Sequence, residues 1–199
     1  QQVKAITVGQ IGNLTDDQIK ALETVDLASL SSNQIVAMQT RQFAAMETEQ
    51  VAALTAKQIA AIETQDIAAW GSDQVQALTT SQLPALTNYQ VSRLTTTTLA
   101  ALTTDQIQAL TPKAISVLTP TQVSNLSTDQ VAALTTKQLQ ALTPTSITAL
   151  TTDQVAALTT SQVVALTGNQ IKSLSTSHMQ ALTTEQVPAL EAQIGRAHV

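Results

Sequence analysis

Side chains that could bind a metal or take part in catalysis are few and widely spaced in this sequence. The chain has two histidines, His178 and His198, and no cysteine. A metal site needs three or four converging ligands, and neither histidine has carboxylate or cysteine partners at a ligand spacing. We therefore expect no metal and no cofactor. We interpret His178 as a variant of the glutamine that fills the same place in most repeats.

Single aspartates recur at one place of the repeat described below. They are Asp17, Asp73, Asp105, Asp129 and Asp153. Calcium prefers carboxylate oxygens, but these residues lie an octad or more apart, and aspartate in the first turn of a helix favours the helix dipole in any case. No Ser-His-Asp set, phosphate-binding glycine loop or pair of catalytic carboxylates can be assembled. The sequence therefore predicts no catalytic residues and no enzyme.

Three aromatic residues stand out because the chain has no others. Phe43 and Trp70 fall in the apolar columns of the repeat, and we expect them in the core. Tyr89 falls at a variable place in the segment "TNYQVSRL", residues 87–94, which departs from the consensus. Tyr89 and Arg93 are the best candidates for a partner-binding surface.

The chain is a series of repeats of eight residues, and this repeat decides where each of the residues above lies. Every eighth residue from Ile6 to Leu190 is large and apolar, and so is every eighth residue from Val3 to Val187. Eight residues turn an α-helix by about 800°, so this stripe would drift about 80° per repeat around a continuous helix. The chain must therefore break its helix in every octad.

The break has the chemistry of a helix start. In "LTTDQV", residues 150–155, the first threonine and the glutamine three places later form a capping box. Serine or threonine fills the cap position in 18 of the 23 octads from Thr7 to Leu190. Pro112, Pro120 and Pro144 directly follow their caps, at the one helical place where the missing amide costs nothing. Pro84 and Pro188 fall four places later and fit only if the helix is nearly finished there.

These signals predict an all-α solenoid of very short capped helices, one per octad. We expect a single solenoid over residues 1–190, with 23 octads from Thr7 and a partial one before them, and an off-register tail over residues 191–199. The chain starts in mid-pattern, with Gln2 already in register, and we expect it to be a piece of something longer. A β-solenoid is the alternative, because threonine and valine favour strands.

The number of octads per turn stays open in the sequence. A 24-residue echo, from Asp105 to Asp129 to Asp153, fits three octads per turn. Stacked aspartates would repel each other mildly, and a duplicated gene explains the echo as well. We therefore prefer two octads per turn, with two facing rows of helices.

Composition excludes several classes of function. The chain of 199 residues is 43% hydrophobic and 12% charged, with a net charge of −5. This hydrophobic content favours order, since disordered chains combine low hydrophobicity with high charge. Nine Lys and Arg residues argue against nucleic acids and anionic membranes as partners. No apolar run approaches the roughly 18 residues that a membrane-spanning helix needs, so we expect no membrane insertion.

Residues 3–190 resemble the arrays of "LTTDQ(V/I)xAL" octapeptides in very large bacterial secreted or surface proteins of haemagglutinin- or repeat-toxin-like architecture. The resemblance implies a non-catalytic spacer or stalk, or a protein-interaction scaffold, outside the cell or on its surface. It carries no catalytic residues. The alternative is an adhesin module that binds ice, glycans or another partner, including a second copy, through an exposed face of threonines. A second threonine follows the cap position in 13 of the 23 octads, among them Thr104, Thr128, Thr152 and Thr176.

Overall fold

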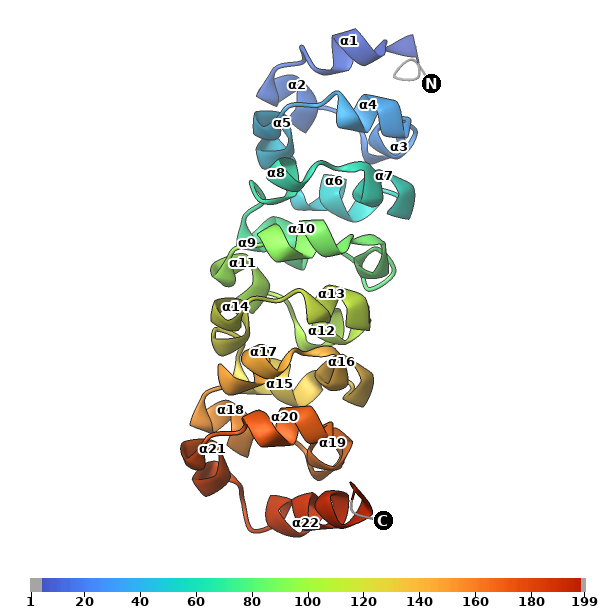
Figure 1. Cartoon of the computed structure of the whole chain (residues 1–199). Helices are drawn as coiled ribbons and strands as arrows, with labels where there is room; N and C mark the ends of the chain where they lie inside the picture. The colour runs from blue at the N-terminus through green and yellow to red at the C-terminus, as the bar shows by residue number, and fades with distance from the viewer. Residues whose placement is uncertain (1–4, 198–199) are drawn as a thin grey trace. The chain divides into compact units, whose positions relative to one another are not determined.

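The computed structural model describes residues 5–197, so Gln2, Val3 and His198 lie outside it. In these residues helices are the only regular elements (Figure 1), and each octad from Thr7 to Leu190 holds one. The bounds are α1 Val8–Ile11, α2 Asp16–Lys20, α3 Thr24–Ala28, α4 Ser32–Val36, α5 Thr40–Ala45, α6 Thr48–Ala53, α7 Ala56–Ala61, α8 Thr64–Ile67, α9 Ser72–Gln76, the 3-10 helix η2 Leu83–Ala85, α10 Asn88–Arg93, α11 Thr96–Ala100, α12 Thr104–Ala109, α13 Pro112–Ser116, α14 Pro120–Ser124, α15 Thr128–Ala133, α16 Thr136–Ala141, α17 Pro144–Thr148, α18 Thr152–Ala156, α19 Thr160–Ala165, α20 Gly168–Ser173, α21 Thr176–Ala181 and α22 Gln186–Ala197. The predicted class, an all-α solenoid of short capped helices, is confirmed.

The capping boxes start the helices as predicted. At α7, the Thr55 hydroxyl accepts the backbone N–H of Gln58 at 3.3 Å, and the Gln58 side chain accepts the backbone N–H of Thr55 at 2.7 Å. Thr55 is extended, with φ −75° and ψ 157°, and so is Ile62 after the helix, with ψ 132°. The extended cap and the extended apolar residue before it form the corner between one helix and the next.

Five of the 23 octads start without a hydroxyl at the cap position. In three of them, at Gln39, Glu47 and Gly71, no side-chain atom of the cap residue accepts a backbone N–H of the helix. Each of these residues still donates its backbone N–H to the side-chain oxygen of the glutamine three places later, at 2.7–3.0 Å. Half of the capping box is therefore enough to start a helix in this fold.

The prolines follow the prediction at four places and depart from it at one. Pro112, Pro120 and Pro144 each begin an α-helix. Pro84 lies in η2, a 3-10 helix that ends at Ala85, so the helix is nearly finished at this proline, as expected. Our expectation for Pro188 is wrong: it lies in the first turn of α22, where no amide donor is needed, and the helix continues through the predicted tail to Ala197.

The described residues form two compact units, which divide after Leu102. Within each unit a helix packs on the helix three octads further along the chain, as α2 does on α5 and α5 on α8 in the first unit. In the second unit α12 packs on α15 and α15 on α18 in the same way. One turn of each coil therefore takes about three octads. The expected two facing rows are wrong, because the two extended residues at each corner do not reverse the chain.

The apolar columns form the core of each coil. At the place four residues after the cap, Val51, Ile59, Val131 and Leu139 are fully buried. Phe43 and Trp70 are buried as expected, and the Trp70 ring N–H donates to the Phe43 carbonyl at 3.2 Å. Burial weakens near the end of the second unit, where Met179 and Val187 are 43% and 41% exposed.

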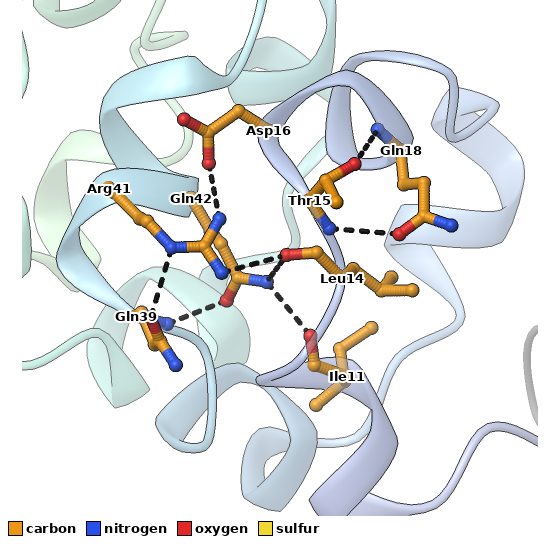
Figure 2. A network of polar contacts seen from close by, with 8 residues as sticks. All are labelled: Ile11, Leu14, Thr15, Asp16, Gln18, Gln39, Arg41 and Gln42. Atoms are coloured by element: carbon orange, nitrogen blue, oxygen red, sulfur yellow. Dashed lines mark hydrogen bonds and ion pairs between the residues drawn. The ribbon is translucent and has the colours of Figure 1, made fainter.

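A buried glutamine forms hydrogen bonds from one turn to the turn before it, a role that was not predicted from the sequence. Figure 2 shows Gln42, which is fully buried. Its side-chain oxygen accepts the backbone N–H of Gln39 at 2.7 Å, and its amide nitrogen donates to the carbonyls of Ile11 and Leu14 at 2.9 and 2.8 Å. These carbonyls lie at the end of the first octad, where helices leave acceptors without internal donors. One side chain thus caps the start of its own helix and also supplies a hydrogen-bond donor to carbonyls at the end of another octad.

The same contacts recur through both units. Gln58 and Gln138, for example, donate to carbonyls 28 and 31 residues earlier at 2.7–2.9 Å. Ser146 keeps the contact 28 residues earlier, with its hydroxyl 3.1 Å from the Leu118 carbonyl. Among the residues that the structure describes, every buried side-chain nitrogen or oxygen has a hydrogen-bond partner. The glutamine column is therefore part of the core.

Candidate binding groove at Tyr89 and Arg93

His178 takes the place of the capping glutamine, as the sequence predicts, and it also reaches the preceding turn, which the sequence did not predict. It is buried, its Nδ1 accepts the backbone N–H of Ser175 at 3.4 Å, and its Nε2 lies 2.8 Å from the Leu150 carbonyl. A neutral imidazole with its proton on Nε2 satisfies both contacts. Between residues 5 and 197, no group of three or more His, Asp or Glu side chains is arranged to hold a metal ion.

The structure gathers part of the second threonine column on one face. Thr104, Thr128, Thr152 and Thr176 begin α12, α15, α18 and α21, which pack on one another in the second unit, and all four are exposed. An exposed aspartate directly follows each of the first three threonines. This face is therefore a mixture of hydroxyl groups and charged carboxylates.

Tyr89 and Arg93, the predicted candidates, lie at the two ends of α10 and line one groove of about 470 Å³. The opposite wall comes from α8 and the residues before it, three octads earlier, with Glu63, Thr64 and Gln65. These three residues could not be predicted as part of the site, since the stacking of α10 on α8 follows from the number of octads per turn. The structure thus brings both candidates together and adds a second wall.

The floor of this groove is rigid. It includes Ile62 and Gln90, and the buried Gln90 side chain donates to the carbonyls of Ile62 and Ile59 at 2.7 and 2.8 Å. The same side chain accepts the backbone N–H of Thr87 at 2.7 Å. Three hydrogen bonds to the backbone hold Gln90 in place, so the groove has a fixed base.

The rim of the groove is polar and exposed. Tyr89 is 79% exposed, and the Gln65 amide donates to the Glu63 carboxylate at 3.0 Å. Within residues 5–197 no carboxylate lies within ion-pair distance of Arg93, whereas Arg41 forms an ion pair with Asp16. The groove therefore offers an aromatic ring, a guanidinium, a carboxylate and an amide to a ligand.

A second groove, of about 370 Å³, has the equivalent position between α6 and α9. It is lined by Met46, Glu47, Thr48, Gly71, Ser72, Asp73 and Gln74. Asp73 takes the place of Tyr89 in the octad, and Glu47 takes the place of Glu63. This groove has two carboxylates and neither an aromatic ring nor a guanidinium. The groove itself therefore recurs in the fold, whereas the side chains of the groove at Tyr89 are particular to that groove.

One buried carboxylate was not singled out by the sequence analysis. Asp66 replaces the bridging glutamine in α8 and is 2% exposed. Burial raises the pKa of this carboxyl above its ordinary value, the hydrogen bond from Thr40 opposes the shift, and the charge of Glu63 adds to it. The sequence could have indicated this residue, because Asp66 is an acidic residue at a place of the octad where glutamine is usual.

The comparisons with known proteins agree with the repeat. The family model described as the ALTTAQ repeat matches residues 19–56, 58–96, 99–136, 115–144 and 136–168. These matches cover more than half of the chain, and the protein belongs to the ALTTAQ repeat family. No curated protein matches it. In the described part of the chain, no helix combines the length and the apolar character that crossing a bilayer requires.

Proposed function

We propose that this chain is a non-catalytic spacer or interaction scaffold of a bacterial surface or secreted protein. The single observation that carries the proposal is the repeated bridge from a buried glutamine to the carbonyls of the preceding turn. Each bridge binds main-chain atoms, so a turn needs no particular neighbour. An array built in this way gains length and surface by adding turns, which is what a spacer or scaffold requires.

The partners in this proposal are proteins or surface ligands. A net charge of −5 repels nucleic acids and anionic lipids. The sequence offers no set of catalytic residues, and the proposal therefore includes no reaction.

The alternative is an adhesin module that binds through its threonine-rich face. The exposed threonines of α12, α15, α18 and α21 favour it, because they form a regular hydroxyl surface. Asp105, Asp129 and Asp153 lie directly beside them. These charges favour hydrated polar ligands, such as proteins or glycans, over ice.

Antibody labelling of the source bacterium tests the proposal. An antibody raised against the chain should label intact cells or a protein in the culture medium. Labelling that appears only after the cells are lysed would overturn the surface or secreted location. A spacer should also keep its reporter exposed when one turn is removed, so we would display the chain between a surface anchor and an epitope. Loss of all epitope accessibility after deletion of residues 127–150 would contradict the spacer role.

A further inference from the structure

The groove at Tyr89 holds four exposed side chains that the coil does not use. The side chains of Glu63, Gln65, Tyr89 and Arg93 make none of the hydrogen bonds that join one turn to the next. Each lies on the rim of a floor that the Gln90 side chain fixes. These four polar or aromatic side chains surround one groove with a fixed floor, and they are available to bind a ligand.

We propose that this groove binds a neutral pyranose, as a single sugar or as one ring of an oligosaccharide. A carboxylate, a carboxamide and a guanidinium are planar groups, and each presents two acceptors or donors side by side. Neighbouring sugar hydroxyls have the matching spacing. The Tyr89 ring offers an apolar surface for the C–H face of the same ring, and its hydroxyl supplies a further polar contact.

The charges of the groove favour a ligand without net charge. Glu63 carries one negative charge and Arg93 one positive charge, so an anion and a cation each meet a group of the same sign. The hydrogen bond from Gln65 to Glu63 orders both side chains before a ligand arrives, which lowers the entropy cost of binding. A volume of about 470 Å³ lies within the range of small-molecule sites.

The groove between α6 and α9 is a built-in control. It has the same place in the fold and the same glutamine floor, formed by Gln74. Asp73 stands where Tyr89 stands, and the place of Arg93 is taken by Ala77. Without the ring and the guanidinium, this groove should not bind the same sugars.

The necessary variants should fold. Tyr89 and Arg93 are both exposed, and Arg93 occupies a place where most octads have alanine, so Arg93→Ala restores the repeat consensus. The matched control is Asp73→Ala, which removes an exposed side chain from the second groove. Circular dichroism of each variant at 222 nm checks that the helices remain.

The experiment uses the only tyrosine of the chain. Incorporation of ¹³C-labelled tyrosine gives one set of ring signals, and we would titrate the full chain with maltose, cellobiose, lactose and N,N′-diacetylchitobiose. A saturable shift of the ring signals with at least one sugar is the expected result. Calorimetry should then show that Tyr89→Ala and Arg93→Ala each weaken binding about tenfold or more, while Asp73→Ala changes it by less than about twofold.

Three results would overturn the proposal. They are the absence of a saturable shift with every sugar, an equal affinity of the wild type and Arg93→Ala, and a response to inorganic phosphate in place of sugars. A spacer role needs no sugar, so failure here leaves the function proposed above in place, and the two outcomes are distinguishable.

Discussion

The hydroxyl of Thr40 donates a hydrogen bond of 2.6 Å to the carboxylate of Asp66, across the contact between α5 and α8. In most octads the residue at this place is a glutamine, whose amide donates to carbonyls of the preceding turn, as Gln58 does, whereas an ionised carboxylate only accepts. Asp66 therefore puts a buried carboxyl group where most octads have an amide donor.

We expect Asp66 to make stability depend on pH. Its pKa is raised above the ordinary value of 3.8, so the folded chain holds this proton more tightly than the unfolded chain. The free energy of unfolding should therefore fall as pH rises from about 3.8 through the raised pKa. Urea unfolding between pH 4 and 8 should show this fall in the wild type and lose it in Asp66→Asn. The exposed Asp73→Asn is the control, and an unchanged pH profile in Asp66→Asn would contradict the assignment.

We expect Asp66→Gln to stabilise the chain at pH 7, because it replaces a carboxyl group whose charged form is disfavoured by burial and returns an amide donor to the column. The gain should be on the order of 1–2 kcal/mol in the free energy of unfolding. Urea denaturation measures it directly. A loss of stability would show that the carbonyls of the preceding turn are already satisfied at this place.

The bridging glutamines should contribute more to the free energy of unfolding than glutamines that only cap a helix. Gln138 is 1% exposed and donates to Ile107 and Leu110, whereas Gln18 is exposed and its side chain makes only capping contacts. Methionine has the length of glutamine but no amide. Gln138→Met should therefore cost about 2–5 kcal/mol, since buried carbonyls lose their donors. Gln18→Met should cost about 1 kcal/mol or less. Equal losses in urea denaturation would remove the bridging role.

His178 should behave as a structural residue. Glutamine can make both of its contacts, so His178→Gln should change the free energy of unfolding by less than about 1 kcal/mol. His178→Leu should cost about 1–3 kcal/mol, because the Leu150 carbonyl loses its partner. Addition of Zn²⁺, or of EDTA, should leave Tm unchanged in a thermal melt. A rise in Tm with Zn²⁺ would instead indicate a metal site at this histidine.

Whole octads should be removable from the chain, and fractions of an octad should not. Deleting residues 127–150 takes out three octads and joins Leu126 to Thr151, so that caps and columns keep their register. Circular dichroism should show a helical chain that melts cooperatively at a lower temperature, as in other repeat proteins. Deleting residues 131–142 joins Gln130 to Thr143, within an octad, and should abolish the cooperative melt. Similar melts for both deletions would contradict a fold built on octads.

The sequence was sufficient to predict the helices, because their determinants are local. The hydroxyl of Thr55 and the glutamine three places later specify where α7 begins, whatever lies around them. Pro188 misled the prediction because the octad pattern fails a few residues later, and a longer helix shifts the same proline into its first turn.

Contacts between turns could not be predicted, because nothing within an octad specifies its stacking partner. Gln58 carries the same capping-box signature as Gln18, yet only Gln58 is buried against the preceding turn. Tyr89 and Arg93 were found because they depart from the consensus. Glu63 and Gln65 join them only through the three-octad turn, which the sequence left open.

The bridges between turns also have a consequence for how such genes change. The Gln42 amide binds the carbonyls of Ile11 and Leu14, and a carbonyl is the one group that every residue supplies. Unequal recombination between copies of the repeat can therefore add or remove units of eight codons without a compensating mutation elsewhere. Outward-facing side chains such as Tyr89 are then free to diversify, one copy at a time.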